Sequence, residues 1–264
     1  MAHSVLARGE DAPSLFFHDE GTGPPAMLIH GVGADSSSWE EIAPLLTQRF
    51  RVLRLDLRGH GRSGGIEGAC TLDDFIRDVV DVMDAAGAAK ADVVGFSLGG
   101  LIAQGIALSH PGRVDRLALI SAVAGRTDEE RAKVRARLEV LRNEGIEAIM
   151  AAAQERWFTP EFMQAHPEEV RYRMEQLKRN DPDSYKAAYT VFSMSDLGER
   201  LHNIRHRTLI VTGEHDVGSS TRMARYMHEQ IPGSELHILS GLRHSVLVEA
   251  PEQVGSLLTR FLTA

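Results

Sequence analysis

Ser97 is the residue whose setting points most directly to chemistry. A glycine lies two positions before it, Gly95, and another two positions after it, Gly99. The apolar run 91–94 predicts a buried strand and residues 98–108 carry apolar side chains at helical spacing, so the chain turns at the serine. Such a turn leaves no room for neighbouring Cβ atoms, strains the serine backbone and holds the hydroxyl out at the end of the sheet. We expect a nucleophile here; the alternative is a glycine-rich turn with an incidental serine.

His244 is the best candidate for the base that this hydroxyl needs, because a serine is a poor nucleophile until its proton is accepted. Ligands of open α/β sheets bind beyond the carboxyl ends of the strands, so the base should follow a strand. Of the twelve histidines, His244 follows the last predicted strand, whereas His206 precedes a strand and His237 lies within one. His110 and His228 fall on helices or at helix ends. A solvated loop histidine is the alternative interpretation of His244.

Asp216 is the expected partner of that histidine, which needs a carboxylate to hold its tautomer and stabilise its charged form. Both Glu214 and Asp216 follow the penultimate predicted strand. Asp216 is favoured because it lies in the loop beyond the strand end, whereas Glu214 is close enough to the strand to pair locally. Asp56 also follows a strand but precedes Ser97, and sites of this layout use the order serine, acid, histidine. An aspartate that only forms a turn is the alternative.

Attack on a carbonyl builds negative charge on oxygen, which backbone N–H donors must stabilise. One donor is expected to be the N–H of Leu98, at the start of the helix that follows Ser97, where the helix dipole adds to the effect. The other is expected to be the N–H of Val32, because Gly31 and Gly33 on either side allow the backbone to turn inward. His30 is then a residue that fixes this loop; a second base is the alternative.

The elements that position these residues alternate between strands and helices, which predicts a mostly parallel sheet with helices on both faces. The expected strands span residues 5–7, 14–17, 26–29, 51–55, 91–94, 114–120, 208–212 and 235–239, the first two forming an antiparallel pair at one edge. Residues 127–198 hold amphipathic helical segments and no convincing strand. We therefore expect an α/β core of residues 1–122 and 200–264, interrupted by a helical cap at 123–199.

Composition excludes several other classes of protein. The chain has 264 residues and a formal net charge of −8 without a basic block, which argues against nucleic acid or an anionic membrane as partner. Its one cysteine, Cys70, cannot form an internal disulfide, and nothing resembles the paired cysteines of a metal site. Residues 1–10 lack a signal-peptide core and no run reaches membrane-span length, so we expect a cytoplasmic protein. Whether it forms a homo-oligomer stays open.

Four segments together resemble the α/β-hydrolase family, and the resemblance covers nearly the whole chain. They are His30-Gly31-Val32-Gly33, Gly95-Phe96-Ser97-Leu98-Gly99-Gly100, Gly213-Glu214-His215-Asp216 and Gly241-Leu242-Arg243-His244. Residues 56–63 resemble that family's structural loop after the fourth strand. A serine at position 97 argues against haloalkane dehalogenases and epoxide hydrolases, which carry an aspartate there. The resemblance implies a serine hydrolase that requires no metal and no organic cofactor.

Within the family the chain is most similar to 3-oxoadipate enol-lactonases and small carboxylesterases, through residues 156–162. This similarity implies an ester or enol-lactone substrate and an acyl-enzyme on the serine. Apolar residues of the cap are expected either to line its pocket or to form the core of the cap: Trp157, Phe158, Phe162, Phe192 and Met194. A carboxylate on the substrate would require a cation, for which Arg142 and Arg156 are equally good candidates.

Three other functions remain consistent with the same resemblance. A carbon–carbon bond hydrolase of ring-cleavage products would turn over a dienoate, and a cofactor-free perhydrolase would support peroxide-dependent halogenation. A ligand receptor built on the same scaffold would bind a signal molecule tightly with negligible turnover. For a histidine base that works only when neutral, activity is expected to fall at acid pH.

Overall fold

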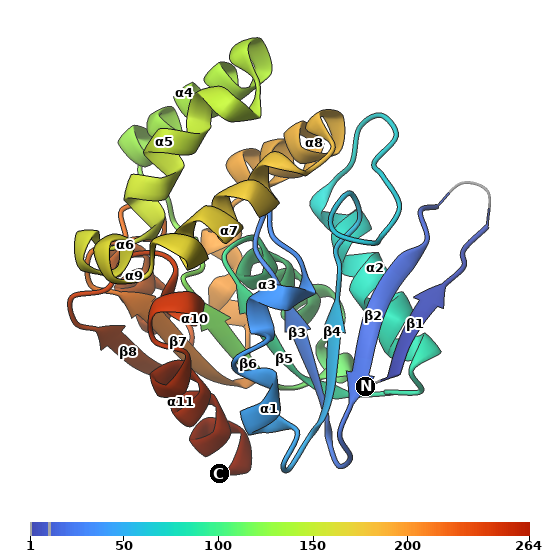
Figure 1. Ribbon diagram of the computed structural model, residues 1–264. Coiled ribbons are helices and arrows are strands. Elements are labelled where there is room, and N and C mark those ends of the chain that lie inside the picture. The colour runs from blue at the N-terminus through green and yellow to red at the C-terminus, as the bar shows by residue number, and fades with distance from the viewer. Residues whose placement is uncertain (1, 10–11) are drawn as a thin grey trace.

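The computed structural model describes residues 2–9 and 12–264, which form an eight-stranded sheet (Figure 1). The strands are β1 (Ala2–Leu6), β2 (Leu15–Glu20), β3 (Pro25–Ile29), β4 (Arg51–Leu55), β5 (Ala91–Phe96), β6 (Val114–Ile120), β7 (Arg207–Gly213) and β8 (Glu235–Leu239). Their order in space is β1-β2-β4-β3-β5-β6-β7-β8. Strand β2 is antiparallel to both of its neighbours, and the remaining pairs are parallel. The predicted α/β-hydrolase fold, with its antiparallel edge, is thus confirmed.

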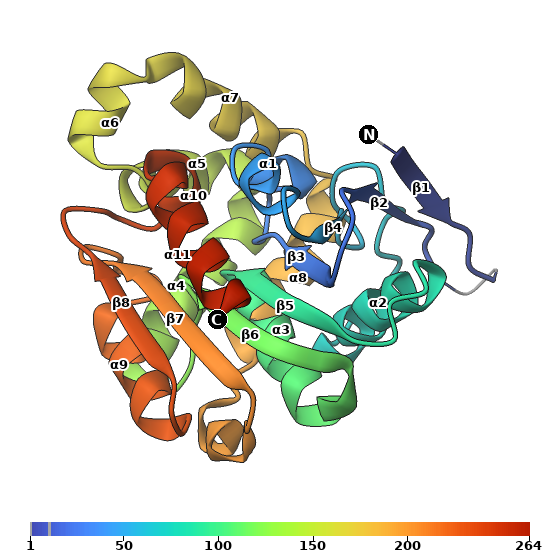
Figure 2. The same cartoon turned by 90° about the horizontal axis from the view of Figure 1, so that it is seen from below.

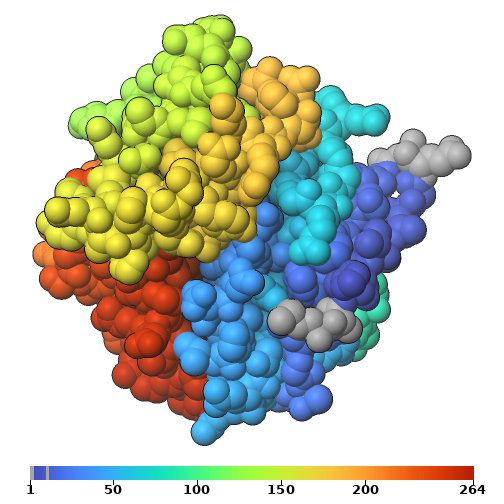
Figure 3. All heavy atoms as spheres, in the orientation of Figure 1, coloured from blue at the N-terminus to red at the C-terminus, as the bar shows by residue number. Residues whose placement is uncertain are grey.

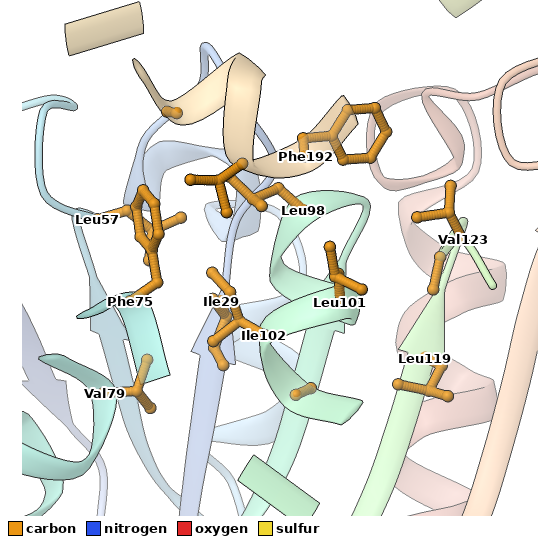
Figure 4. Packing of buried hydrophobic residues seen from close by; sticks show 14 of the residues in the cluster. Ile29, Leu57, Phe75, Val79, Leu98, Leu101, Ile102, Leu119, Val123 and Phe192 are labelled. Carbon is orange, nitrogen blue, oxygen red and sulfur yellow. The ribbon is translucent and has the colours of Figure 1, made fainter. Parts of the chain in front are cut away.

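Side chains alternate along the central strands between two apolar cores, one on each face of the sheet. Met27 and Ile29 of β3 point into one core, and Ala26 and Leu28 point into the other. The first core is covered by α2 (Leu72–Ala85), α3 (Leu98–Ser109) and α9 (Thr221–Gln230), and Figure 4 shows Phe75, Leu101 and Ile102 packing there. The second is covered by α1 (Ala43–Leu46), α10 (Val246–Glu249) and α11 (Pro251–Thr263), which Figure 2 shows gathered on one side of the sheet. A parallel sheet buried on both faces explains the continuous apolar runs of its strands.

Consecutive helices connect β6 to β7 and lie over the carboxyl ends of the strands. They are α4 (Asp128–Glu144), α5 (Ile146–Trp157), α6 (Pro160–Ala165), α7 (Pro167–Lys178) and α8 (Pro182–Met194), and together they are called the cap below. Figure 3 shows the cap as one continuous layer above the core. The structure describes residues 127–198 throughout and has no strand there, while the division into domains at 122/123 and 199/200 stays a prediction.

Local residue types explain where the cap helices begin and end. Thr127 caps α4 by accepting the N–H of Glu130, whose carboxylate accepts the N–H of Thr127 in return. Proline occupies the first helical position of α6, α7 and α8, where its missing N–H has no partner to lose. Gly145, at φ 85°, separates α4 from α5. In the part of the chain that the structure describes, no helix is both long and apolar enough to cross a bilayer.

A buried carboxylate at the amino end of the sheet should make stability depend on pH. Asp92 of β5 is 1% exposed and accepts the N–H of Arg116 at 3.1 Å. Burial raises the pKa of Asp92 to about 6, against the opposing effect of the Arg116 guanidinium. The folded protein therefore binds this proton more tightly than the unfolded chain, whose aspartate has a pKa of about 3.9. Its contribution to stability is present below pH about 4 and is lost as the pH rises through about 6.

We expect Asp92→Asn to raise the free energy of unfolding at pH 8 by about 3 kcal/mol, since the folded and unfolded pKa values differ by about two units and one unit corresponds to about 1.4 kcal/mol. The asparagine oxygen can still accept the Arg116 N–H. Urea unfolding of both proteins at pH 4 and pH 8 measures the effect, which should vanish at the lower pH. An asparagine variant that is less stable than the parent at pH 8 would contradict this account.

Candidate active site

Ser97 lies at a strained turn between β5 and α3. Its backbone has φ 54° and ψ −114°, a combination that residues other than glycine rarely adopt. Glycine is required on both sides: a Cβ at Gly95 would lie 2.1 Å from the carbonyl oxygen of Gly99, and one at Gly99 would lie 2.2 Å from that of Ile29. Close packing of β5 against α3 therefore accompanies the strained backbone of Ser97. Ser97 itself lines a cavity between the sheet and the cap.

Asp216 and His244 are hydrogen-bonded to each other in loops at the same end of the sheet. Asp216 follows β7, His244 lies between β8 and α10, and His244 Nδ1 is 2.6 Å from Asp216 Oδ2. The other carboxylate oxygen, Oδ1, accepts the N–H groups of Gly218 and Ser219, both at 2.8 Å. Because an ionised carboxylate only accepts hydrogen bonds, Nδ1 carries the proton and Nε2 is left to accept one. These contacts hold the imidazole in the tautomer that a general base needs.

Ser97, Asp216 and His244 all line the same cavity. The rings of Phe96 and His244 lie 5.1 Å apart between centroids, which places the imidazole beside the residue that precedes Ser97. No hydrogen bond joins the side chains of Ser97 and His244, both of which the structure describes. Catalytic hydrogen bonds of this kind often tighten only in the complex with substrate.

The two competing acids are engaged elsewhere. Glu214 accepts a hydrogen bond from the Ser240 hydroxyl at 2.8 Å, which is the local pairing expected from its place next to the strand. Asp56 is 1% exposed and accepts the backbone N–H groups of Ser36, at 2.8 Å, and Arg62, at 2.9 Å. Both oxygens of Asp56 therefore stabilise loops, and only Asp216 contacts the histidine.

His30 is a buried structural residue of the loop after β3. Its Nε2 accepts the N–H of Leu57 at 2.9 Å, so its Nδ1 donates to the carbonyl oxygen of Gly31 at 2.7 Å. Burial lowers the pKa of His30, which keeps the ring neutral. With both nitrogens in use, His30 fixes the loop as expected and has no nitrogen left to act as a base.

The N–H groups of Val32 and Leu98 are free to bind an oxyanion. Leu98 is the first residue of α3, where helical N–H groups lack an intrahelical partner. Val32 lies on the cavity wall, in a loop that approaches the serine so closely that a Cβ at Gly31 would be 3.1 Å from Ser97 Cβ. Within residues 2–9 and 12–264, neither N–H donates a hydrogen bond to another protein group. Their role as an oxyanion hole stays a prediction.

Three of the apolar cap residues proposed from the sequence line the cavity, namely Trp157, Phe158 and Phe192. The other two do not, which corrects the expectation. Met194 is 58% exposed because it lies two positions, about 200° of helical rotation, beyond Phe192 on α8. Phe162 lies on α6 and stacks between Phe158, at 5.8 Å between ring centroids, and His166, at 4.7 Å. Its ring belongs to the packing of the cap.

Sequence reasoning missed two tyrosines of the cavity wall. Tyr185 and Tyr189 lie on α8, are 1% and 7% exposed, and line the cavity together with Phe192. The spacing of 185, 189 and 192 places the three aromatic side chains on one face of the helix, and this periodicity is the signal that could have identified them.

The cap also brings arginines to the cavity. Arg156 and Arg137 both line it, and neither pairs with a carboxylate in the part of the chain that the structure describes. Arg137 Nε donates to the hydroxyl of Tyr189 at 3.2 Å. Burial lowers the pKa of Arg156, and the nearby positive charge of Arg137 lowers it further. Arg142, the alternative cation, instead points to the exposed side of α4 and pairs with Glu139 at 3.0 Å.

The chain is similar to proteins of known fold and activity along nearly its whole length. A family model described as alpha/beta hydrolase fold matches residues 24–251. The chain is 27% identical to the (E)-2-((N-methylformamido)methylene)succinate hydrolase of Acinetobacter baylyi, over 99% of this chain and 98% of that protein. It is 25% identical to 3-oxoadipate enol-lactonase 1 of the same organism, over 98% and 97% of the two chains. The solved enol-lactonase from Burkholderia xenovorans superimposes with a TM-score of 0.90 at 28% identity, covering 96% of this chain and 98% of that one.

Proposed function

The chain belongs to the alpha/beta hydrolase fold family, and on that premise we propose that it is a serine hydrolase that cleaves a carboxylic ester or an enol-lactone. The observation that carries this proposal is the 2.6 Å hydrogen bond between Asp216 and His244 on the wall of the cavity that Ser97 lines from a strained turn. A histidine held by a carboxylate next to a strained serine is the arrangement that activates a hydroxyl for acyl transfer.

The proposed reaction has two acyl-transfer steps. Ser97 Oγ attacks the carbonyl carbon while His244 Nε2 accepts its proton, and the N–H groups of Val32 and Leu98 stabilise the oxyanion. His244 then returns the proton to the leaving oxygen, which breaks the ester bond and leaves an acyl group on Ser97. Water gives its proton to the same nitrogen as it attacks the acyl-enzyme, and the acid leaves as Ser97 recovers its proton.

A substrate panel tests the reaction class. We expect the protein to hydrolyse p-nitrophenyl esters or lactones, and a fluorophosphonate to label Ser97, as located by peptide mass spectrometry. Turnover of a dienoate without turnover of any ester or lactone would favour carbon–carbon bond hydrolysis instead. Peroxide-dependent halogenation would favour a perhydrolase, and tight binding of a small molecule without turnover would favour a receptor.

We further propose that the partner of this site is a small ester or lactone that carries a carboxylate, which Arg156 binds with help from Arg137. Arg156 and Arg137 pair with no carboxylate among the described residues, and both line a cavity where an anion would gain charge-assisted hydrogen bonds from them. Asp216, the one acid on the cavity wall among the described residues, is occupied by His244 and two backbone N–H groups. Two similar proteins carry succinate and 3-oxoadipate in their names, which supports an anionic substrate.

We expect Arg156→Gln to raise KM for carboxylate-bearing esters roughly 10- to 100-fold, because a hydrogen bond between charged groups contributes about 1.5–3 kcal/mol. KM for neutral p-nitrophenyl esters should change less than about threefold. Arg142→Gln is the matched control, since this arginine lies on the exposed side of the cap, and it should leave both substrates unaffected. Equal losses on charged and neutral esters would rule out carboxylate recognition by Arg156.

A further inference from the structure

The cap segment that follows α5 is hydrogen-bonded to the segment that carries His244. The backbone N–H of Ser245 donates to the carbonyl oxygen of Trp157 at 2.9 Å. Arg243 Nη1 donates to the carbonyl oxygen of Phe158, also at 2.9 Å. The two residues that flank His244 are therefore each hydrogen-bonded to the cap, Ser245 to Trp157 and Arg243 to Phe158, although the two segments lie more than 80 positions apart in the sequence.

A side-chain contact between Glu249 and Thr159 closes this connection. Glu249 is the last residue of α10, and its carboxylate accepts the Thr159 hydroxyl at 2.5 Å and the Thr159 N–H at 3.1 Å. Thr159 is 8% exposed and caps the amino end of α6, where its hydroxyl accepts the N–H of Phe162 at 3.2 Å. A single carboxylate thus satisfies both donors of the residue at which the cap changes direction.

The same carboxylate is connected to the histidine through one helical turn. The N–H of Glu249 donates to the carbonyl oxygen of Ser245 at 2.9 Å, so displacement of Glu249 is passed to the residue after His244. On the opposite side, the Ser121 hydroxyl donates to the carbonyl oxygen of His244 at 3.2 Å. The segment that carries His244 is therefore held from two sides, by the core through Ser121 and Asp216 and by the cap through residues 157–159.

Burial gives this carboxylate an energetic cost that its contacts offset only in part. Burial raises the pKa of Glu249 more than the hydrogen bonds from Thr159 lower it. A glutamine of similar size would avoid the loss of charge hydration, but it offers one acceptor oxygen in place of two, and its other terminal atom is an NH2 donor that cannot accept from Thr159. The two donors of Thr159 therefore favour a carboxylate at position 249.

We propose that Glu249 is a positioning residue: by holding Thr159, it fixes cap residues 157–159 against α10 and so sets the position of His244 relative to Ser97. This inference rests on the proposed serine-hydrolase function. Trp157, Phe158 and Val248 all line the cavity, so the contact holds together the two parts of the wall that meet beside the histidine. A displacement of about 1 Å is enough to cost on the order of a hundredfold in rate, which makes such a contact functionally significant.

The test compares Glu249→Ala with Glu252→Gln, an exposed glutamate at the start of α11 that serves as the matched control. For a neutral p-nitrophenyl ester we expect Glu249→Ala to lower kcat about 10- to 100-fold with KM changed less than about threefold. The rate at which a fluorophosphonate labels Ser97 should fall by a similar factor. Both rates are divided by the folded fraction measured from thermal unfolding, so that lost stability does not count as lost activity. The control should match the parent protein.

Variants of Thr159 keep the proposal falsifiable if Glu249→Ala does not fold. Thr159→Ser retains the hydroxyl and should retain kcat, whereas Thr159→Val removes the hydroxyl bond, keeps the backbone N–H bond to Glu249 and should lose part of what Glu249→Ala loses. In the double variant Glu249→Ala/Thr159→Val the loss should not exceed that of Glu249→Ala alone, because the valine change removes one of the hydrogen bonds that Glu249 accepts. Additive losses, a normal labelling rate in folded Glu249→Ala, or equal activity of the serine and valine variants would each overturn the proposal. Failure of fluorophosphonate to label the parent protein would instead reject the serine-hydrolase function itself.

Discussion

Ser97→Ala is expected to lower kcat for p-nitrophenyl esters about a millionfold, leaving only the residual rate supplied by substrate binding and the oxyanion donors. The reason is that the alanine retains the fold but has no oxygen to form the acyl-enzyme. Steady-state hydrolysis and intact-protein mass spectrometry measure the loss of turnover and of the acyl adduct. The small volume change at a residue that is 3% exposed should leave the thermal unfolding midpoint near that of the parent protein.

Ser109→Ala is the matched control for this variant, because Ser109 lies at the other end of the same helix. Its hydroxyl donates to the carbonyl oxygen of Gly105 at 2.7 Å and does not line the cavity. We expect its activity to remain within about twofold of the parent, as is usual for a change remote from the chemistry. Retention of more than about one per cent of activity in Ser97→Ala would mean that another group carries the acyl transfer.

Asp216→Asn should lower kcat about ten-thousandfold, the effect that loss of the correct histidine tautomer has in related chemistry. The two carboxylate oxygens of Asp216 have different hydrogen-bond partners. Oδ1 accepts the N–H groups of Gly218 and Ser219, so the amide oxygen must take that side and the amide NH2 must face His244. Nδ1 then has to accept, the ring proton moves to Nε2, and the nitrogen needed to accept the Ser97 proton is blocked. Hydrolysis rates measured from pH 5 to pH 9 would quantify the loss.

Glu214→Gln is the matched control, since it makes the same change two residues earlier in the same loop. Glu214 accepts hydrogen bonds from the Ser240 hydroxyl and the Gly241 N–H, with no contact to His244 among the described residues. The glutamine oxygen can still accept one of these, so we expect activity within severalfold of the parent. A larger loss of activity for Glu214→Gln than for Asp216→Asn would mean that Glu214, and not Asp216, is the acid partner of His244.

The fold and the places of Ser97, Asp216 and His244 could be predicted because they depend on local rules that the sequence states. Each of the three follows a strand, and in a parallel sheet the carboxyl ends of all strands meet at one edge. The role of Gly95 and Gly99 could be predicted for the same reason, since a tight strand-to-helix turn leaves no room for a Cβ at these two positions. The bounds of the first strand differ from the prediction. Strand β1 spans Ala2–Leu6 and not residues 5–7, because its register pairs Ala2 with Asp19 and Leu6 with Leu15.

The cap shows where such rules end. The sequence of an amphipathic helix shows which of its faces is apolar. Whether that face lines the cavity or packs against another helix depends on how the cap helices pack together. Phe192 therefore lines the cavity while Phe162 stacks within the cap and Met194 is exposed. The choice of Arg156 over Arg142 as a cavity residue was settled in the same way.

The sequence by itself thus determined the sheet, the strained serine turn and the strand ends that carry Asp216 and His244, because each depends on neighbours in the chain. Only the tertiary structure decided which cap side chains line the cavity, that Arg137 accompanies Arg156, and that Glu249 holds Thr159. These contacts join residues up to 90 positions apart, and their formation depends on how whole helices pack, which no local pattern encodes.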